Sequence, residues 1–407
     1  MRILALVVIA LILLVPIVSF STTPKYLHLR NSGPTPSPTS TPPASLTGSY
    51  DFVGSNDAGK NCPSTLPANA NGCAINVKWA RVEPQNGVFD WSFVDAILAN
   101  YSANAVLQLT ISTGEVGTPD SAAVCASLNP PVPACTPWLS GITGVSAHWD
   151  KSGSSGLPCN AALLIPNPAD TTYQAAYAGL IAGIQAKYGG NAKISFIGIS
   201  PISFRGSDLS MGISSKPGNI CGVNETYNAA WSSLSGCADD TCFSNWTRTA
   251  FDTLWYGTGG LATVMTGVNT ILASQATLFP SMTGGPGSSN PNISPLLFTD
   301  ALNHQNSPAN LSLFDEAMSS GAFACNTLTG LVNTIPPNPP PTGGFTGQAV
   351  SNFSNNCTSV CNTGTKWGAY LCGIAGMQVY SSNFSPCSSS IAKMNQAFSG
   401  TPGITCP

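Results

Sequence analysis

One stretch of the chain, residues 74–111, constrains the fold more than any other part. An alternating apolar run at 74–79 predicts a strand, and the dipeptides Glu-Pro and Asn-Gly that follow end it and turn the chain. Asp90 stands where a helix N-cap would be, and residues 91–101 place their apolar side chains on one helical face. A second strand-like run at 105–111 completes a strand–helix–strand unit. Such a unit predicts two neighbouring parallel strands.

The same pattern continues to the end of the chain. Alternating or β-branched apolar runs predict strands, and apolar residues three and four apart predict helices between them. The expected strands are 50–53, 74–79, 106–111, 193–202, 276–282, 323–327, 345–350 and 374–380, and the expected helices include 170–188, 246–256, 261–275, 295–304 and 310–319. Eight strands that alternate with helices predict an α/β fold, a (β/α)8 TIM barrel with disulfide-rich loops.

The first unit also resembles a known family. Its pattern W-x-x-x-E-P-x-x-G-x-F-D-W-x-x-x-D is similar to the second-strand signature of (β/α)8-barrel glycoside hydrolases of the β-galactosidase and cellulase clan (clan A). It is carried by Trp79, Glu83, Pro84, Gly87, Phe89, Asp90, Trp91 and Asp95. The resemblance implies the barrel and a carbohydrate partner, and within the family these residues are architectural.

Composition and the N-terminal segment indicate an exported protein. Residues 1–21 contain an apolar run after Met1-Arg2, which predicts a signal peptide or an uncleaved membrane anchor. Residues 22–46 form a Pro/Thr/Ser-rich linker, and 47–407 form the barrel. Charged residues make up only 8% of the chain, so it has no basic patch for nucleic acid. We therefore expect an extracytoplasmic, secreted or surface-anchored protein, with no prediction of its oligomeric state.

The 14 cysteines all lie beyond the apolar N-terminal run and predict disulfides. The close pairs Cys62/Cys73, Cys125/Cys135, Cys237/Cys242 and Cys357/Cys361 are candidates for stapled loops, although the connectivity is open. Metal binding is the weaker interpretation, because the chain has no CxxC motif and only three histidines. We expect no metal and no cofactor.

The candidate site follows from the barrel, whose functional face is built by the loops after the strands. Asp208 follows the fourth strand, where the clan carries its acid/base, and Glu115 or Glu225 is its candidate partner. The expected substrate contacts are Trp79, Trp138, Arg205, Gln348 and Gln378.

The reaction is less well supported than the fold. Glycoside hydrolysis needs two carboxyl groups, but the seventh strand carries Gln348, and an amide cannot act as the nucleophile. The leading hypothesis is a glycoside-hydrolase-like protein that acts on or binds a neutral poly- or oligosaccharide. The alternative is a catalytically inactive, surface-displayed glycan-binding or structural barrel.

Overall fold

The computed structural model describes a little more than half of the chain, all of it after the predicted linker. The described residues are 48–55, 62–100, 106–112, 116–117, 139, 141–148, 162–189, 191–200, 202, 211–212, 226–257, 269–273, 279–285, 287–293, 296–297, 300, 311–318, 345–349, 357–358, 361–362, 374–399, 401 and 403–406.

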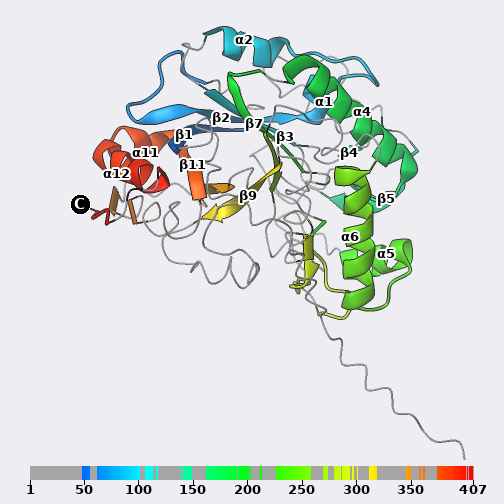
Figure 1. The fold of residues 1–407 in the computed structure, drawn as a ribbon. Coiled ribbons are helices and arrows are strands. Elements are labelled where there is room, and N and C mark those ends of the chain that lie inside the picture. The colour runs from blue at the N-terminus through cyan, green and yellow to red at the C-terminus, as the bar shows by residue number, and fades with distance from the viewer. Residues whose placement is uncertain are drawn as a thin grey trace, which may run out of the picture. The chain divides into compact units, whose positions relative to one another are not determined.

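Eight parallel strands form the centre of the fold (Figure 1). They are β1 (Gly48–Ser55), β2 (Ala70–Lys78), β3 (Val106–Ser112), β7 (Ile194–Ser200), β8 (Asn269–Ala273), β9 (Leu311–Met318), β10 (Phe345–Ala349) and β11 (Ile374–Tyr380). Each pairs in parallel with two neighbours, in the order β1-β11-β10-β9-β8-β7-β3-β2. Because β2 also pairs with β1, the sheet closes into a barrel.

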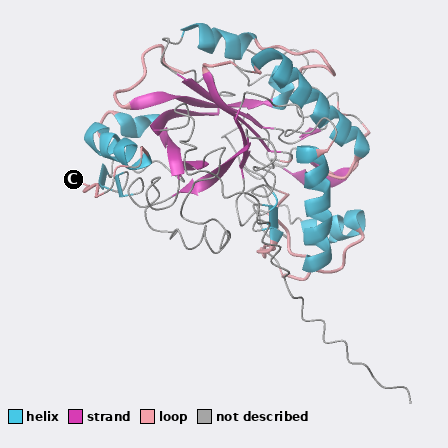
Figure 2. Cartoon of the chain, in the orientation of Figure 1, coloured by secondary structure: helices cyan, strands magenta, loops and turns pink. Residues whose placement is uncertain are grey.

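Helices lie on the outer side of this sheet, as Figure 2 shows. They are α1 (Trp79–Val82), α2 (Ser92–Asn100), α4 (Thr171–Tyr188), α5 (Tyr227–Ser235), α6 (Asp240–Tyr256), α11 (Ser381–Phe384) and α12 (Ser388–Phe398). The large hydrophobic core lies between the two layers, and its strand residues include Ile75, Val77 and Leu109. The alternating pattern in β2 and β3 therefore directs its apolar side chains outward, against the helices.

A smaller antiparallel sheet lies between β3 and β7 in the sequence. Its strands are β4 (Val116–Gly117), β5 (Gly144–His148) and β6 (Ala162–Pro166), in the order β4-β6-β5. The loop before β5 is tied to the start of α4, because the Asp170 carboxylate accepts from the backbone N–H of Thr143 and from its hydroxyl, both at 2.8 Å. The same carboxylate caps α4 by accepting from the N–H groups of Thr172 and Tyr173.

Two strands of the barrel differ from the sequence prediction. The fifth strand is Asn269–Ala273, which lies inside the segment predicted as a helix at 261–275. The prediction that placed this strand at 276–282 is wrong. The sixth is Leu311–Met318, where the sequence favoured a helix with Asp315 and Glu316 on its solvent side. In both segments, pairing with neighbouring parallel strands overrides the weak helical periodicity. The segment predicted as the sixth strand, 323–327, lies outside the described residues.

Four disulfides occur in the described part of the chain. Cys62–Cys73 and Cys237–Cys242 confirm two of the predicted close pairs. The predicted Cys357/Cys361 pair is wrong, because these residues bond instead to Cys387 and Cys406. Cys357 and Cys361 are four residues apart in the sequence, and each bonds to a different C-terminal partner. The predicted Cys125/Cys135 pair lies outside the described residues.

Disulfides of this number are typical of proteins that fold in an oxidising compartment. Among the helices that the structure describes, none has the length and apolar character needed to cross a membrane.

Candidate functional site

The described interior of the barrel contains a layer of neutral polar side chains, which we call the inner polar layer. It consists of Tyr50 on β1, Gln108 on β3, Ser195 on β7 and Gln378 on β11, all buried. Gln378 Nε2 donates to Gln108 Oε1 at 3.1 Å. Since β1 and β2 separate β11 from β3 in the strand order, this bond spans the inside of the barrel. It shows that Gln378 points inward.

No member of the inner polar layer carries a charge. Burial raises the pKa of the Tyr50 phenol above its ordinary value, and interactions with Ser195 and Gln108 offset part of this shift. Tyr50 therefore stays neutral at all physiological pH values. Gln108 Nε2 makes no full hydrogen bond within the part of the chain that the structure describes, although it interacts with the Tyr50 phenol. Gln108 thus contacts both the Gln378 amide and the Tyr50 phenol inside the barrel.

An aromatic pair lies one step closer to the carboxyl ends of the strands. Phe52 and Tyr380 are register partners on β1 and β11, and their rings meet edge to face with centroids 5.3 Å apart. Each lies two residues beyond a member of the inner polar layer, so strand alternation puts the pair on the same inward face. Phe52 is buried, whereas Tyr380 is partly exposed. Tyr380 thus brings an aromatic ring with a hydroxyl group to the carboxyl end of the barrel.

Strand β1 also carries a carboxylate, that of Asp51, on the face opposite to Tyr50 and Phe52. Asp51 lies between Tyr50 and Phe52 in sequence, and its carboxylate accepts a hydrogen bond from the Ser381 hydroxyl at the start of α11. Burial raises the pKa of Asp51, and the bond from Ser381 offsets part of that increase. Asp51 therefore ties the first strand to the start of α11 and does not line the interior.

The second-strand motif forms part of the outer core. Trp79 is 4% exposed and donates its indole N–H to the Glu83 carboxylate at 2.6 Å, and the same carboxylate accepts from the Gly87 N–H at 2.8 Å. Glu83 is itself 1% exposed; burial raises its pKa, partly offset by these two bonds. Trp79 also packs edge-on against Tyr173 of α4. The Glu83 carboxylate thus fixes the turn between β2 and α2, because it accepts from Trp79, which precedes it in the chain, and from Gly87, which follows it.

The aromatic half of the motif packs on α4. Phe89 stacks on Trp91 with centroids 5.4 Å apart, and Trp91 meets Tyr188 edge-on. Phe89 lies so close to Gly183 that a Cβ at this glycine would be 2.3 Å from the ring. Helix α4 therefore needs a glycine where the motif's phenylalanine contacts it.

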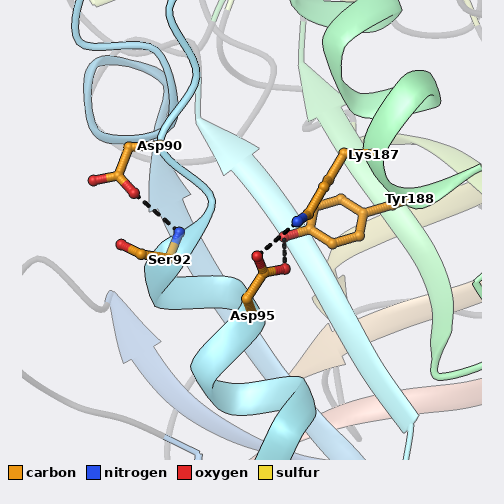
Figure 3. Close-up of polar contacts among 5 residues, drawn as sticks. All are labelled: Asp90, Ser92, Asp95, Lys187 and Tyr188. Atoms are coloured by element: carbon orange, nitrogen blue, oxygen red, sulfur yellow. Dashed lines mark hydrogen bonds and ion pairs between the residues drawn. The ribbon is translucent and has the colours of Figure 1, made fainter.

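The acidic residues of the motif also have structural partners (Figure 3). Asp90 accepts from the Ser92 N–H at 3.0 Å, and thereby caps the start of α2. Asp95 accepts from Lys187 Nζ at 2.7 Å and from the Tyr188 hydroxyl at 3.1 Å, which joins α2 to the end of α4. Together with Glu83, these contacts show that the motif's three carboxylates position helices.

Five other predicted site residues lie outside the described residues, namely Asp208, Glu115, Glu225, Trp138 and Arg205. Gln348 lies on β10, where its backbone pairs in register with that of Gln378 on β11.

The sequence analysis missed Tyr50, Gln108 and Tyr380. The signal that finds them is strand alternation, because Tyr380 follows Gln378 by two residues and shares its face. Within the described residues there is no group of three or more His, Cys, Asp or Glu side chains arranged to hold a metal ion.

Fold and site together define a parallel α/β barrel whose described interior is neutral, with buried amides below an aromatic pair at the carboxyl end. No family model matches the chain, and no curated protein matches it either. Similar solved structures include XacCel5A, with 12% identity and a TM-score of 0.36 over 82% of this chain and 88% of that one. XacCel5A in complex with cellopentaose has 11% identity and a TM-score of 0.36, with coverages of 83% and 89%. The lactosyl-enzyme intermediate of endo-glycoceramidase II from Rhodococcus sp. has 11% identity and a TM-score of 0.36, with coverages of 83% and 73%.

Proposed function

We propose that this chain is an exported (β/α)8 glycoside-hydrolase-like protein that binds a neutral poly- or oligosaccharide and hydrolyses its O-glycosidic bonds. The observation that carries the proposal is the inward face of β1 and β11, where partly exposed Tyr380 lies above the buried amide pair Gln378–Gln108. Sugars are recognised by aromatic rings, which cover their C–H faces, and by amides, which exchange hydrogen bonds with their hydroxyls. A neutral lining matches an uncharged sugar.

The family resemblance supports the same proposal from a separate part of the chain. The resemblance implies an architectural role for the second-strand signature, and the buried Glu83, which accepts from Trp79 and Gly87, supports that role. Under this proposal, Asp208 is the acid/base and Glu115 or Glu225 is its partner carboxylate. Trp138, Arg205 and Gln348 complete the substrate contacts.

The test is the release of reducing ends from a panel of neutral polysaccharides by the full-length protein. We expect release from at least one of them and its loss in Asp208→Asn. A matched control is Asp95→Asn, which removes a carboxylate that bonds only to Lys187 and Tyr188 among the described contacts. Unchanged turnover in Asp208→Asn would remove Asp208 from the site. Absence of both binding and release across the panel would refute the proposed function.

A specific observation favours a second candidate, a surface-displayed barrel that binds glycan without hydrolysing it. The described inward-facing side chains carry no carboxylate, and the seventh strand carries Gln348 where the resembling clan keeps its nucleophile. This candidate predicts retention of the protein on an insoluble polysaccharide without any reducing ends in the supernatant. Release of reducing ends decides for the hydrolase.

A further inference from the structure

The sequence contains two Asn-Gly dipeptides, Asn71–Gly72 and Asn86–Gly87, and the structure holds them differently. In such a dipeptide the backbone nitrogen of the glycine can attack the side-chain amide carbon of the asparagine, and the missing glycine side chain leaves the approach unhindered. The attack closes a five-membered succinimide ring and releases ammonia. How readily it occurs depends on how the fold holds the nitrogen and its proton.

Asn86–Gly87 forms the exposed tip of the turn in the second-strand motif. The turn runs from Gln85 to Val88, whose N–H donates to the Gln85 carbonyl at 2.9 Å. Gly87 has a φ of +72° and Asn86 has no positive φ, which is the pattern of a type II turn. The Asn86 side chain is exposed and makes no hydrogen bond to any residue that the structure describes. No atom lies within 4 Å of the position that a Gly87 Cβ would take, so the side-chain amide has room to approach the nitrogen.

The proton of the attacking nitrogen faces a carboxylate. The Gly87 N–H donates to Glu83 Oε1 at 2.8 Å, and the Trp79 indole holds the other carboxylate oxygen at 2.6 Å. Burial raises the pKa of Glu83, which makes its ionised carboxylate a stronger base than that of an exposed glutamate. General base catalysis needs a base within hydrogen-bond distance of the proton that it takes, and Glu83 has this position.

The hydrogen bond to Glu83 leaves the path of attack open. The N–H bond lies in the plane of the peptide group, whereas the nitrogen attacks with electrons above or below that plane. The carboxylate therefore holds the proton while the Asn86 side chain approaches one face of the peptide group. A carbonyl acceptor at the same place would only hold the nitrogen, but a carboxylate also takes the proton as the new bond forms.

The other dipeptide lies in a different setting. Asn71–Gly72 belongs to β2, and the buried Gly72 pairs with Tyr50 on β1 and with Val106 on β3. The Asn71 side chain lies against Gly48, where a Cβ would be 2.2 Å from the Asn71 Oδ1. Ring closure at Gly72 would require this part of β2 to leave both of its neighbours. The chain thus supplies its own control for the intrinsic reactivity of an Asn-Gly dipeptide.

We propose that Asn86 is a site of spontaneous covalent modification, at which the Gly87 nitrogen attacks Cγ of Asn86 while the Glu83 carboxylate takes up the proton of that nitrogen. The new bond from nitrogen to Cγ replaces the bond from Cγ to the side-chain amide nitrogen, which leaves as ammonia with the proton that Glu83 returns. Water then opens the succinimide at either carbonyl and gives aspartate or isoaspartate at position 86. Both products add a negative charge to the turn, and isoaspartate also adds a methylene to its backbone.

The test follows both dipeptides in one experiment. The full-length protein is incubated at neutral pH and digested, and the peptides that contain Asn71 and Asn86 are analysed by liquid chromatography and mass spectrometry, which distinguish asparagine from aspartate and isoaspartate. In the folded protein we expect Asn86 to be lost at least about tenfold faster than Asn71, and in urea we expect similar rates. Similar rates in the folded protein, or faster loss of Asn71, would overturn the assignment of the site.

Glu83→Gln tests the base, because glutamine can accept the Gly87 N–H but cannot take its proton. Thermal unfolding shows whether the variant is folded. In the folded variant we expect the loss of Asn86 to slow by about tenfold or more, and an unchanged rate overturns the role of Glu83.

If Glu83→Gln does not fold, the wild type decides. Loss of Asn86 that is faster in the folded protein than in urea supports the base, and equal or slower loss overturns its role. Asn86→Gln is the matched control, because its longer side chain cannot close the five-membered ring. A product at position 86 in this variant would overturn the proposed chemistry.

Discussion

The buried carboxylate of Glu83 offers the sharpest test of how the second-strand motif stabilises the fold. In Glu83→Ala, the indole N–H of Trp79 loses its acceptor inside the core, which costs about 1–3 kcal/mol for an unsatisfied buried donor. The Gly87 N–H, which is nearer to solvent, loses a bond worth about 0.5–1.5 kcal/mol. The free energy of unfolding should therefore fall by about 1.5–4.5 kcal/mol. The shift of the urea midpoint at constant slope measures this loss.

The pH dependence gives the same residue a second signature. Its pKa is raised above the ordinary value of 4.5, chiefly by burial, with partial offset from the Trp79 and Gly87 bonds. The folded state therefore binds this proton more tightly than the unfolded state does. The resulting stabilisation is fully present below the unfolded pKa, and it is lost as the pH rises through the folded pKa. Relative to Glu83→Gln, which does not titrate, the wild type should lose stability across that interval.

The control for Glu83 is Asp95→Asn, which removes the charge that binds Lys187 near the surface. Both side chains of that ion pair are more than one third exposed, so the substitution should cost about 1 kcal/mol or less. Equal losses in Glu83→Ala and Asp95→Asn would refute the argument that burial makes Glu83 important. A wild type whose stability rises relative to Glu83→Gln between pH 4.5 and 7 would refute the stated direction of its pKa shift.

Three further predictions concern stability. Gln378→Leu leaves the buried Gln108 Oε1 without its donor and should lower the free energy of unfolding by about 1–3 kcal/mol in urea denaturation. An unchanged free energy of unfolding would show that the amide pair does not stabilise the core. Replacing Cys361 and Cys406 by serine opens a link over 45 residues and should cost about 4 kcal/mol in the same assay; a loss below about 1 kcal/mol would contradict it. Burial alone would raise the pKa of Asp170, but the hydrogen bonds to its carboxylate outweigh burial and lower the pKa. The stabilisation by this carboxylate is therefore present at neutral pH and is lost on acidification. In a series of melting temperatures measured against pH, Asp170→Asn should remove this acid-dependent loss.

The sequence predicted the barrel well wherever periodicity and chain-breaking residues agreed. The last strand coincides with its prediction, because Ile374–Tyr380 is a short apolar run with β-branched residues. The helix that Asp170 caps was also predicted, since the capping residue and the tyrosine stripe both signal it. The fifth and sixth strands were mistaken for helices, because Asn269–Ala273 and Leu311–Met318 are stabilised as strands by neighbours that are distant in sequence.

The candidate site was less predictable, because it depends on which face of each strand a residue occupies. Gln378 was selected from the sequence, but its partner Gln108 lies 270 residues away. Asp315 and Glu316 were predicted on the solvent side of a helix, whereas their segment pairs as strand β9 with β8 and β10. A shift of one residue in register would turn every side chain of a strand to its other face.

The pairing of the first strand with the last has a consequence for how the protein reaches its native state. Until Tyr380 has been synthesised, β1 lacks one of its two neighbours, and the nascent sheet has open edges at both ends. The Asp51–Ser381 bond and both C-terminal disulfides likewise need residues at or beyond position 381. Pairing of β11 with β1 and β10 closes both edges together, and from then on they are no longer exposed to the edges of other nascent chains.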